Sequence, residues 1–257
     1  MPESEMTGWS ARTVCEGVVR VSMRLPYGGS IAGVERLTRM FLLVMGLTGL
    51  ALTGLSGVAM AEASNAAPLK LAVLGDSLTA GYGLPASAAF PVRLQQALKE
   101  KGIAAEIVNA GVSGDTASGG RDRLDWSIPQ GTQAVIVELG ANDMLRGIEP
   151  KVTRAALDQI IQRLKARGID VLLCGMYAAP NLGEPYGKAF NSIYPDLATK
   201  YGVALYPFFL DGVADNAALK QADGLHPTAA GVDAIVQRIL PAVETFVKKV
   251  PPARAAL

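Results

Sequence analysis

The hydrophobic positions from Leu69 onward fall into short apolar runs that are separated by longer amphipathic stretches. Each run is rich in Val, Ile and Leu and alternates little between apolar and polar residues. This pattern is typical of strands that are covered on both faces, as in a parallel sheet. We therefore predict strands at Leu69–Gly75, Ala105–Ala110, Ala134–Leu139, Asp170–Gly175 and Val203–Tyr206.

The stretches between these runs carry the periodicity and the end signals of helices. One predicted helix runs from Pro91, in its first turn, to a glycine exit at Gly102. Another is capped by Thr153 and ends at Gly168. Further helices are predicted over residues 189–202 and 229–249. This alternation implies right-handed βαβ units and a doubly wound α/β fold, whose site lies beyond the carboxyl ends of the strands.

The apolar run over residues 40–59 stands apart from this pattern. It is uncharged, follows two arginines and ends in an Ala-X-Ala sequence at Ala61, which is how secretory signal peptides are built. The run also approaches the roughly 20 residues that span a bilayer, so an uncleaved anchor is the alternative. Its glycines and threonines, together with the small residues at its end, favour cleavage.

We therefore predict a leader over residues 1–61, cleavage after Ala61, and a periplasmic or secreted single domain over residues 62–257. No stable membrane span would remain after cleavage. The segment before about position 36 is too long for the start of a signal peptide, and it contains several glutamates. Its length and charge favour an internal start, at Met23 or Met40.

The charge balance and the cysteine content exclude some classes of function. Lys and Arg number 24 against 23 Asp and Glu. This balance argues against a nucleic-acid partner, which needs a concentrated basic surface. Cys15 and Cys174 belong to no Cys-X-X-Cys or Cys/His cluster, so neither a metal nor a cofactor is predicted. Removing the leader leaves Cys174 as the single cysteine, which excludes an internal disulfide bond. We also expect the mature protein to be a monomer.

The single histidine, His226, carries the candidate acid–base chemistry. Its imidazole can accept and return a proton near neutral pH. Asp223 lies three residues earlier, a spacing that lets both side chains emerge from one turn and the carboxylate orient the ring. The alternative is a solvated turn before the last helix. With one histidine, we expect one acid limb in a pH–rate profile.

Further candidates stand at the ends of the first three predicted strands. Ser77 follows the first strand, where the alternative is a helix cap or a turn. Gly114 lies in a glycine-rich loop that lacks the P-loop pattern, and it offers a bare backbone N–H to an oxyanion. Asn142 is either an ordinary turn residue or an amide donor to an oxyanion. Each motif is weak alone, but their order and common placement form a strong joint signal.

The segments GDSLTAGYG, NAGVSGDT, ELGANDMLRG and DGLHP resemble the four sequence blocks of the SGNH (GDSL) hydrolases. Within that family the chain is most similar to the bacterial secreted thioesterase I, arylesterase and lysophospholipase group. The resemblance implies a flavodoxin-like three-layer α/β/α sandwich with a five-stranded parallel sheet, and a serine acyl-ester hydrolase. It makes Ser77 the nucleophile, His226 the general base and Asp223 its orienting carboxylate. It also assigns the oxyanion hole to Ser77, Gly114 and Asn142.

The substrate class follows less directly from the residues. Met, Leu and Tyr near the strand ends either line an apolar acyl groove or pack as ordinary loops. The resemblance implies ester, thioester or lysophospholipid substrates with short to medium acyl chains. The alternatives are a carbohydrate O-acetyl esterase, which the same quartet supports, and an exported binding module without catalytic activity. The residues predicted to contact the substrate are Asp76, Met144, Leu145, Pro180 and Tyr186.

Overall fold

A computed structural model describes residues 67–251 of the chain. The predicted leader over residues 1–61 and its cleavage position lie outside these residues. Within the described part of the chain, no helix combines the length and the apolar character that a membrane span requires.

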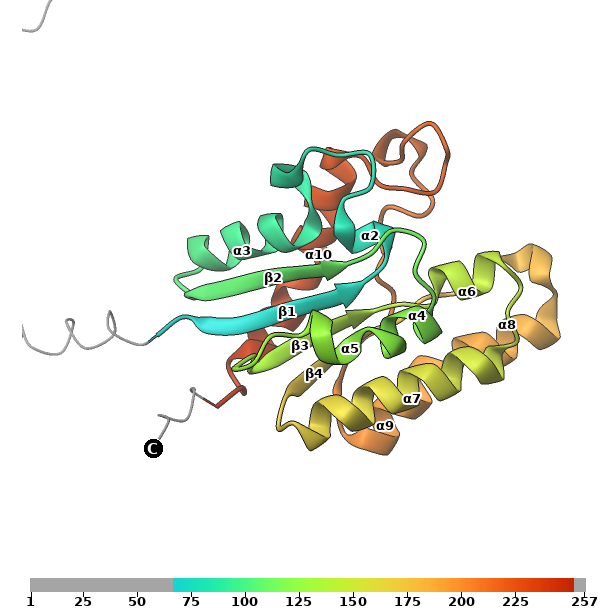
Figure 1. The fold of residues 1–257 in the computed structure, drawn as a ribbon. Helices are drawn as coiled ribbons and strands as arrows, with labels where there is room; N and C mark the ends of the chain where they lie inside the picture. The colour runs from blue at the N-terminus through green and yellow to red at the C-terminus, as the bar shows by residue number, and fades with distance from the viewer. Residues whose placement is uncertain (1–66, 252–257) are drawn as a thin grey trace, which may run out of the picture. The chain divides into compact units, whose positions relative to one another are not determined.

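A parallel sheet forms the centre of the fold, with the strands in the order β2-β1-β3-β4-β5 (Figure 1). This is the flavodoxin-like order: β2 lies on one side of β1, and β3, β4 and β5 follow one another on the other side. The predicted five-stranded parallel sheet is therefore confirmed, and each strand differs from its predicted bounds by no more than a residue or so. The strands are β1 (Leu69–Gly75), β2 (Ala105–Gly111), β3 (Ala134–Glu138), β4 (Asp170–Cys174) and β5 (Ala204–Tyr206).

Helices cover both faces of the sheet and complete the predicted three-layer sandwich (Figure 1). One layer consists of α3 (Phe90–Glu100) and α10 (Ala229–Val247), which pack against each other. The other layer contains α4 (Ala117–Asp122), α5 (Leu124–Ser127), α7 (Pro150–Ala166), α8 (Glu184–Asn191) and α9 (Ile193–Tyr201). Short helical turns lie at or near the strand ends: α2 (Ser77–Ala80), η2 (Ala86–Ala88), α6 (Ala141–Leu145), η3 (Pro180–Leu182) and η4 (Ala217–Leu219).

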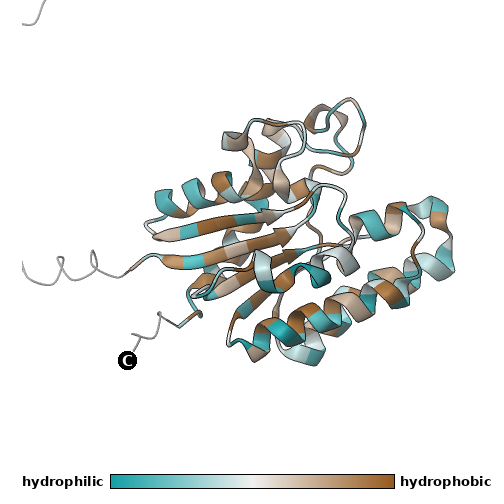
Figure 2. Ribbon diagram, viewed as in Figure 1, coloured by the Kyte–Doolittle hydropathy of each residue, from teal (hydrophilic) through white to brown (hydrophobic). Residues whose placement is uncertain are grey.

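The inner strands are apolar and buried, as Figure 2 shows by the hydrophobic colour along β1, β3 and β4. Fully burying one Val, Leu or Ile side chain contributes about 1.5–3 kcal/mol, so these strands anchor the core. The expectation of burial on both faces is wrong for β2, whose residues are mostly exposed or half-buried. The same holds for β5, and the physical reason is that both strands lie at the edges of the sheet, where the helix layers cover the faces less completely than at the inner strands.

Two details of the predicted helices are wrong. Thr153 is not a cap, because α7 already begins at Pro150, whose fixed φ suits the first helical turn. The predicted helix over residues 189–202 is two helices with a break at Ser192. Pro195 explains the break, since it has no N–H to donate to the carbonyl of residue 191 and its ring crowds that carbonyl.

Candidate active site

Ser77 stands where β1 ends and a single helical turn begins. Asp76 caps this turn, because its Oδ1 accepts a hydrogen bond of 2.9 Å from the backbone N–H of Leu78. Ser77 is the first residue of α2, so its own N–H has no partner within the helix. The cap thereby fixes the backbone at Ser77, so that its hydroxyl and its backbone N–H both lie at the carboxyl end of β1.

The last predicted motif folds over this serine. The Nε2 atom of His226 lies 2.9 Å from Ser77 Oγ, and its Nδ1 atom lies 2.6 Å from Asp223 Oδ2. The other oxygen of Asp223 accepts the backbone N–H groups of Leu225 and His226 at 2.9 and 3.0 Å. With Nδ1 donating to the carboxylate, Nε2 is the acceptor that faces the serine hydroxyl.

The hydrogen bonds from His226 and Leu225 lower the pKa of Asp223 to about 2. The first cause is the backbone N–H of His226, followed by its ring, and burial contributes only a small opposing effect. The Asp223 side chain is 37% exposed. Asp223 is therefore ionised throughout the pH range in which the imidazole can work as a base.

Tyr82 covers the histidine from the side of α2. Its ring lies 4.5 Å from the His226 ring, centroid to centroid, with 37° between the planes. Gln221 holds this contact in place, because its side-chain amide donates to the carbonyl oxygens of Tyr82 at 2.8 Å and Pro227 at 2.9 Å. The histidine turn is thus tied to the serine turn at points other than the catalytic hydrogen bond.

Gly114 lies in the loop after β2 with φ of +83°, a conformation that favours glycine. Its carbonyl oxygen accepts a 2.6 Å hydrogen bond from Arg146, and its N–H has no acceptor among residues 67–251. Arg123 braces the loop from beneath: it is buried and bonds to Asp115 Oδ2 at 2.6 Å and to the carbonyl of Gly75 at 3.0 Å. The free N–H is therefore held in a fixed loop.

Asn142 lies in α6, the turn that follows β3. Its Nδ2 atom donates to Asp76 Oδ2 at 3.0 Å, which directs the amide toward the serine turn. Gly140 lets the chain turn here, with φ of +119° and no room for a side chain: a Cβ atom would lie 2.2 Å from the Tyr194 hydroxyl. The structure thus brings an amide donor to the same edge as Ser77.

One predicted substrate contact is wrong. Asp76 has no exposed surface, and both of its carboxyl oxygens are occupied, by Leu78 and by Asn142. Its burial raises its pKa to about 6, against the opposing effect of these hydrogen bonds. Asp76 therefore supports the site from below and has no surface with which to contact a substrate.

The other predicted substrate-contact residues lie in the segments that follow β3 and β4. Leu145 is 53% exposed, whereas Met144 is half-buried and packs against the core. Pro180 is exposed at the start of η3, and Tyr186 is half-buried with its hydroxyl donating to the carbonyl of Ile148 at 2.8 Å. These positions leave both the acyl groove and ordinary loop packing open for this region.

Sequence reasoning missed four residues that shape the site: Tyr82, Arg123, Glu138 and Arg146. Glu138 had a signal, because it is a carboxyl group inside an otherwise apolar run of strand residues. Arg123 had none, and Arg146 lies in the third motif, but both become part of the site through contacts that join segments far apart in the chain. Tyr82 lies within the first motif, but its contact with His226 depends on tertiary structure.

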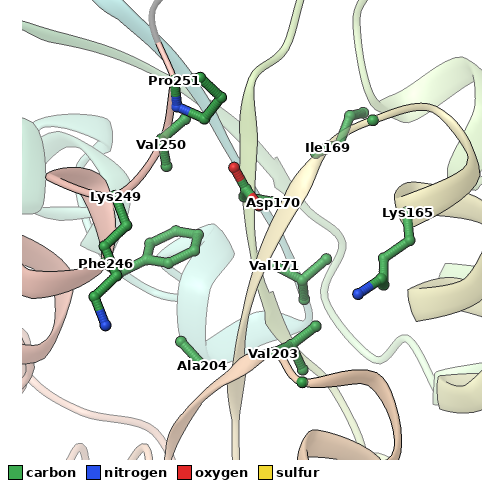
Figure 3. Close-up of a pocket in the computed structure, with 12 residues that line it drawn as sticks. Lys165, Ile169, Asp170, Val171, Val203, Ala204, Phe246, Lys249, Val250 and Pro251 are labelled. Carbon is green, nitrogen blue, oxygen red and sulfur yellow. The ribbon is translucent and has the colours of Figure 1, made fainter.

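A cavity of about 550 Å³ lies at the opposite end of the sheet (Figure 3). It is lined by residues that begin β4 and β5 and by the end of α10, including Lys165, Asp170, Val203, Phe246 and Lys249. None of the predicted site residues lines it. This cavity is therefore separate from the Ser77 site, although both belong to the same sheet.

The described residues contain no group of three or more His, Cys, Asp and Glu side chains arranged to hold a metal ion. Cys174 is a buried free thiol.

A serine, a histidine and an aspartate joined in sequence by hydrogen bonds, at the carboxyl end of a parallel sheet, define the class of serine hydrolases. Residues 73–234 match the model of the GDSL-like Lipase/Acylhydrolase family. The chain belongs to this family, and it is a serine acyl-ester hydrolase of the SGNH type.

Individual relatives agree with this assignment. The esterase TesA of Pseudomonas aeruginosa is 38% identical over 180 residues, which cover 70% of this chain and 90% of the relative. The thioesterase 1/protease 1/lysophospholipase L1 of Escherichia coli is 43% identical over 158 residues, 61% of this chain and 74% of the relative. Among solved structures, the SGNH-hydrolase family esterase AlinE4 is 46% identical with a TM-score of 0.60, covering 70% of this chain and 96% of its own.

Proposed function

We propose that Ser77 is the nucleophile of a two-step acyl transfer, with His226 as general base and acid and Asp223 as the carboxylate that orients it. The observation that carries this assignment is the hydrogen-bond chain from Asp223 Oδ2 through the imidazole to Ser77 Oγ, with links of 2.6 and 2.9 Å. Such a chain fixes the tautomer that can remove the serine proton.

In the first half-reaction, Ser77 Oγ attacks the carbonyl carbon of the ester or thioester while its proton passes to His226 Nε2. The carbonyl oxygen becomes an oxyanion, which the N–H groups of Ser77 and Gly114 and the side-chain amide of Asn142 stabilise. The tetrahedral intermediate then breaks its bond to the leaving oxygen or sulfur. The leaving group takes the proton from Nε2, and the acyl group stays on Ser77.

In the second half-reaction, water replaces the leaving group. His226 removes a proton from the water as its oxygen attacks the acyl carbon, and the same donors stabilise the second oxyanion. The bond to Ser77 Oγ breaks, the serine recovers its proton from Nε2, and a carboxylic acid is released. Because the chain has a single histidine, the same imidazole serves both halves.

The proposed substrates are short- to medium-chain acyl esters, thioesters and lysophospholipids. Relatives named esterase, thioesterase and lysophospholipase support this range. Exposed apolar side chains at the same edge of the sheet also support it, since Leu145, Tyr177 and Leu225 are each about half exposed. A series of p-nitrophenyl esters should show that activity rises with acyl length before it declines, whereas strict preference for acetyl would count against an acyl groove.

We further propose that the enzyme is exported, with a leader over residues 1–61 that is cleaved after Ala61, and that residues 62–257 act as a monomeric periplasmic or secreted domain. The charged, apolar and small-residue segments of the leader support export. N-terminal sequencing of the protein from the cell envelope should begin at Glu62, and size-exclusion chromatography should give the mass of one chain. An intact leader or a dimer would contradict the respective part.

The decisive test of the catalytic assignment is a pair of serine variants. Ser77→Ala should lower kcat for p-nitrophenyl ester hydrolysis by about 10⁴-fold or more, since a triad without its nucleophile keeps only residual activity. Ser87→Ala is the matched control, because Ser87 is exposed in η2 and outside the site. A folded Ser77→Ala enzyme with near-normal turnover would overturn the proposal.

A further inference from the structure

Glu138 is a carboxyl group in the apolar interior. It is the last residue of β3 and is 1% exposed. In the sheet it is paired with Gly75 of β1 on one side and Cys174 of β4 on the other. Its Oε2 atom lies 3.0 Å from the point that a Cβ atom of Gly75 would occupy. The carboxyl group is thus packed beneath the serine turn, next to the residue that precedes Asp76.

Within residues 67–251, no cationic side chain pairs with this group. Both Glu138 oxygens are buried without a hydrogen-bond donor among residues 67–251. The titratable side chains that face it are the Asp76 carboxyl group, the Cys174 thiol and the Tyr194 phenol, from the serine turn, β4 and α9. None of them is positively charged. An ionised carboxylate without partners in such a place is strongly unfavourable, and a second carboxylate beside it adds to the cost.

The neighbouring Asp76 differs in its hydrogen bonds. Its two oxygens accept from Leu78 N–H at 2.9 Å and from Asn142 Nδ2 at 3.0 Å, so its ionised form is stabilised. Glu138 has only the backbone N–H of Asp76 nearby, and this group does not reach hydrogen-bond geometry with either of its oxygens. Burial, and then the charge of Asp76, raise the pKa of Glu138 well above its ordinary value. When two adjacent buried carboxyl groups share one negative charge, the charge belongs on the one with donors.

We propose that Glu138 is held as a neutral, protonated acid that positions the Asp76 carboxylate and, through it, the oxyanion-binding amide of Asn142. The inference rests on the proposed function of the Ser77 site. A protonated Glu138 gains a partner by donating its O–H to Asp76, which no ionised form could do. Asp76 is then held by donors from three directions, and the amide of Asn142 keeps one orientation.

The neutral state also has an electrostatic consequence. The reaction develops negative charge on the substrate oxygen, which hydrogen-bond donors stabilise and nearby anions oppose. When Glu138 is protonated, Asp76 is the one negatively charged member of this buried carboxyl pair. Glu138 is therefore a positioning residue for the known reaction, and it has no contact of its own with the reacting atoms.

Two variants separate the donor from the bulk of the side chain. Glu138→Gln keeps the size, the neutral charge and an N–H donor, and it should hold kcat within about threefold of the wild type. Glu138→Leu removes the donor, and it should lower kcat by about 10-fold or more with KM changed less than about twofold, since oxyanion stabilisation acts mainly in the transition state. Cys174→Ala, at the paired position in β4, is the control for disturbance of the core and should leave kcat unchanged.

Two readouts extend the test beyond rates. The infrared spectrum of the wild-type enzyme at neutral pH should contain the C=O stretch of a buried carboxylic acid, and the Glu138→Gln spectrum should lack it. The wild-type rate should fall at alkaline pH as Glu138 ionises, and the Glu138→Gln rate should not. Both readouts remain available if Glu138→Leu fails to fold.

Several results would overturn the inference. They are a Glu138→Leu enzyme with wild-type kcat, a Glu138→Gln enzyme as impaired as Glu138→Leu, and a spectrum without the acid band. A failure of the proposed function is distinguishable from these, because it would appear as turnover in Ser77→Ala, whereas the infrared band does not depend on catalysis.

Discussion

Asp223 and Asp76 are hydrogen-bonded to His226 and Asn142, the two side chains proposed to act with Ser77, yet their surroundings are opposite. Asp223 is 37% exposed and bonds to His226, and backbone and ring hydrogen bonds lower its pKa to about 2. Asp76 is fully buried and bonds to Asn142, and burial raises its pKa to about 6. The same chemical group thus supports the base from a solvated turn and the oxyanion donor from the interior.

Different physical effects therefore control the charge of these two carboxylates. Donor hydrogen bonds determine the charge of Asp223, so it stays ionised whatever the state of its neighbours. Desolvation raises the pKa of Asp76, and the hydrogen bonds from Leu78, Asn142 and Glu138 oppose it, so its charge depends on the buried groups around it. The following predictions test each half of this comparison, beginning with the largest effect.

Breaking the exposed pair should have the largest effect. In Asp223→Asn, the amide favours the wrong imidazole tautomer, so Nε2 no longer accepts the serine proton. Losses of about 10⁴-fold in kcat are typical of this change in a triad. We expect roughly 10³- to 10⁴-fold here, measured with p-nitrophenyl esters. Asp211→Asn, a surface change on the Arg238 ion pair, should leave kcat unchanged, and a similar loss in both variants would remove the distinction.

Breaking the buried carboxylate should have a smaller effect. In Asp76→Asn, the amide cannot accept on both sides, so the Leu78 N–H or the Asn142 amide loses its acceptor. Removing one oxyanion donor typically costs 10²–10³ in kcat, and we expect a loss of about 10²-fold. Asp122→Asn makes the same substitution in an exposed ion pair and is the control. If Asp76→Asn keeps full kcat, Asp76 does not orient Asn142.

Removing the ring that covers the histidine should have a still smaller effect. The Tyr82 ring lies 4.5 Å from the His226 ring, and such aromatic pairs contribute about 0.5–1.5 kcal/mol. Tyr82→Ala should therefore lower kcat by about 3- to 10-fold, whereas Tyr82→Phe keeps the ring and should stay within about twofold. Equal losses in the two variants would show that the hydroxyl matters more than the stacking.

The buried carboxyl groups of Asp76 and Glu138 and the exposed carboxylate of Asp223 should make the free energy of unfolding depend on pH in opposite directions. The folded pKa of Asp76 and that of Glu138 are raised, so the stability that they contribute is complete below about pH 4 and is lost as pH rises through the folded values. The folded pKa of Asp223 is lowered, so its contribution is present above about pH 4 and is lost as pH falls toward 2.

Calorimetry between pH 4 and 8 can isolate the buried half of this effect, taking about pH 4 as the reference for unfolded carboxyl groups. In Glu138→Gln, the decline of Tm with rising pH should be shallower than in the wild type. Identical slopes in the two proteins would show that Glu138 does not carry a raised pKa. Because the Asp223 side chain is 37% exposed and solvent screens its charge, its own contribution on the acid side should be small.

The expectation of one acid limb in the pH–rate profile rests on the single histidine. In the structure, burial raises the pKa of Asp76 to about 6, and Asp76 bonds to Asn142. We therefore expect Asp76 to add to the loss of activity at low pH. A count of histidines could not reveal this, because the raised pKa comes from burial in the folded protein.

The sequence was most informative where local chemistry determines structure. The apolar runs of β1, β3 and β4 predicted the sheet, and the motifs after β1, β2 and β3 predicted the placement of Ser77, Gly114 and Asn142. Strands this apolar have few alternatives in a protein of this size, and glycine or asparagine at a strand end marks a turn. The break at Ser192 was predictable in principle, since Pro195 disfavours a continuous helix.

The sequence was least informative where a side chain acts through distant partners. Arg123 joins the ends of β1 and β2, and Arg146 reaches across to the Gly114 loop. Arg123 stands in no pattern that distinguishes it from a surface residue, and the third motif, which contains Arg146, gives no sign of its bond to Gly114. Asp76 was predicted to contact substrate, but it caps the serine turn and its carboxyl group is buried. Such roles depend on packing, which periodicity and spacing do not encode.

The central claim, that Ser77 is a nucleophile activated by His226, is tested most directly by covalent labelling with a fluorophosphonate followed by peptide mass spectrometry. The wild-type enzyme should take up one equivalent, located on Ser77. His226→Ala should react far more slowly, and Ser77→Ala should not react. Labelling at another residue, or equally fast labelling of Ser77 in the absence of His226, would contradict the claim.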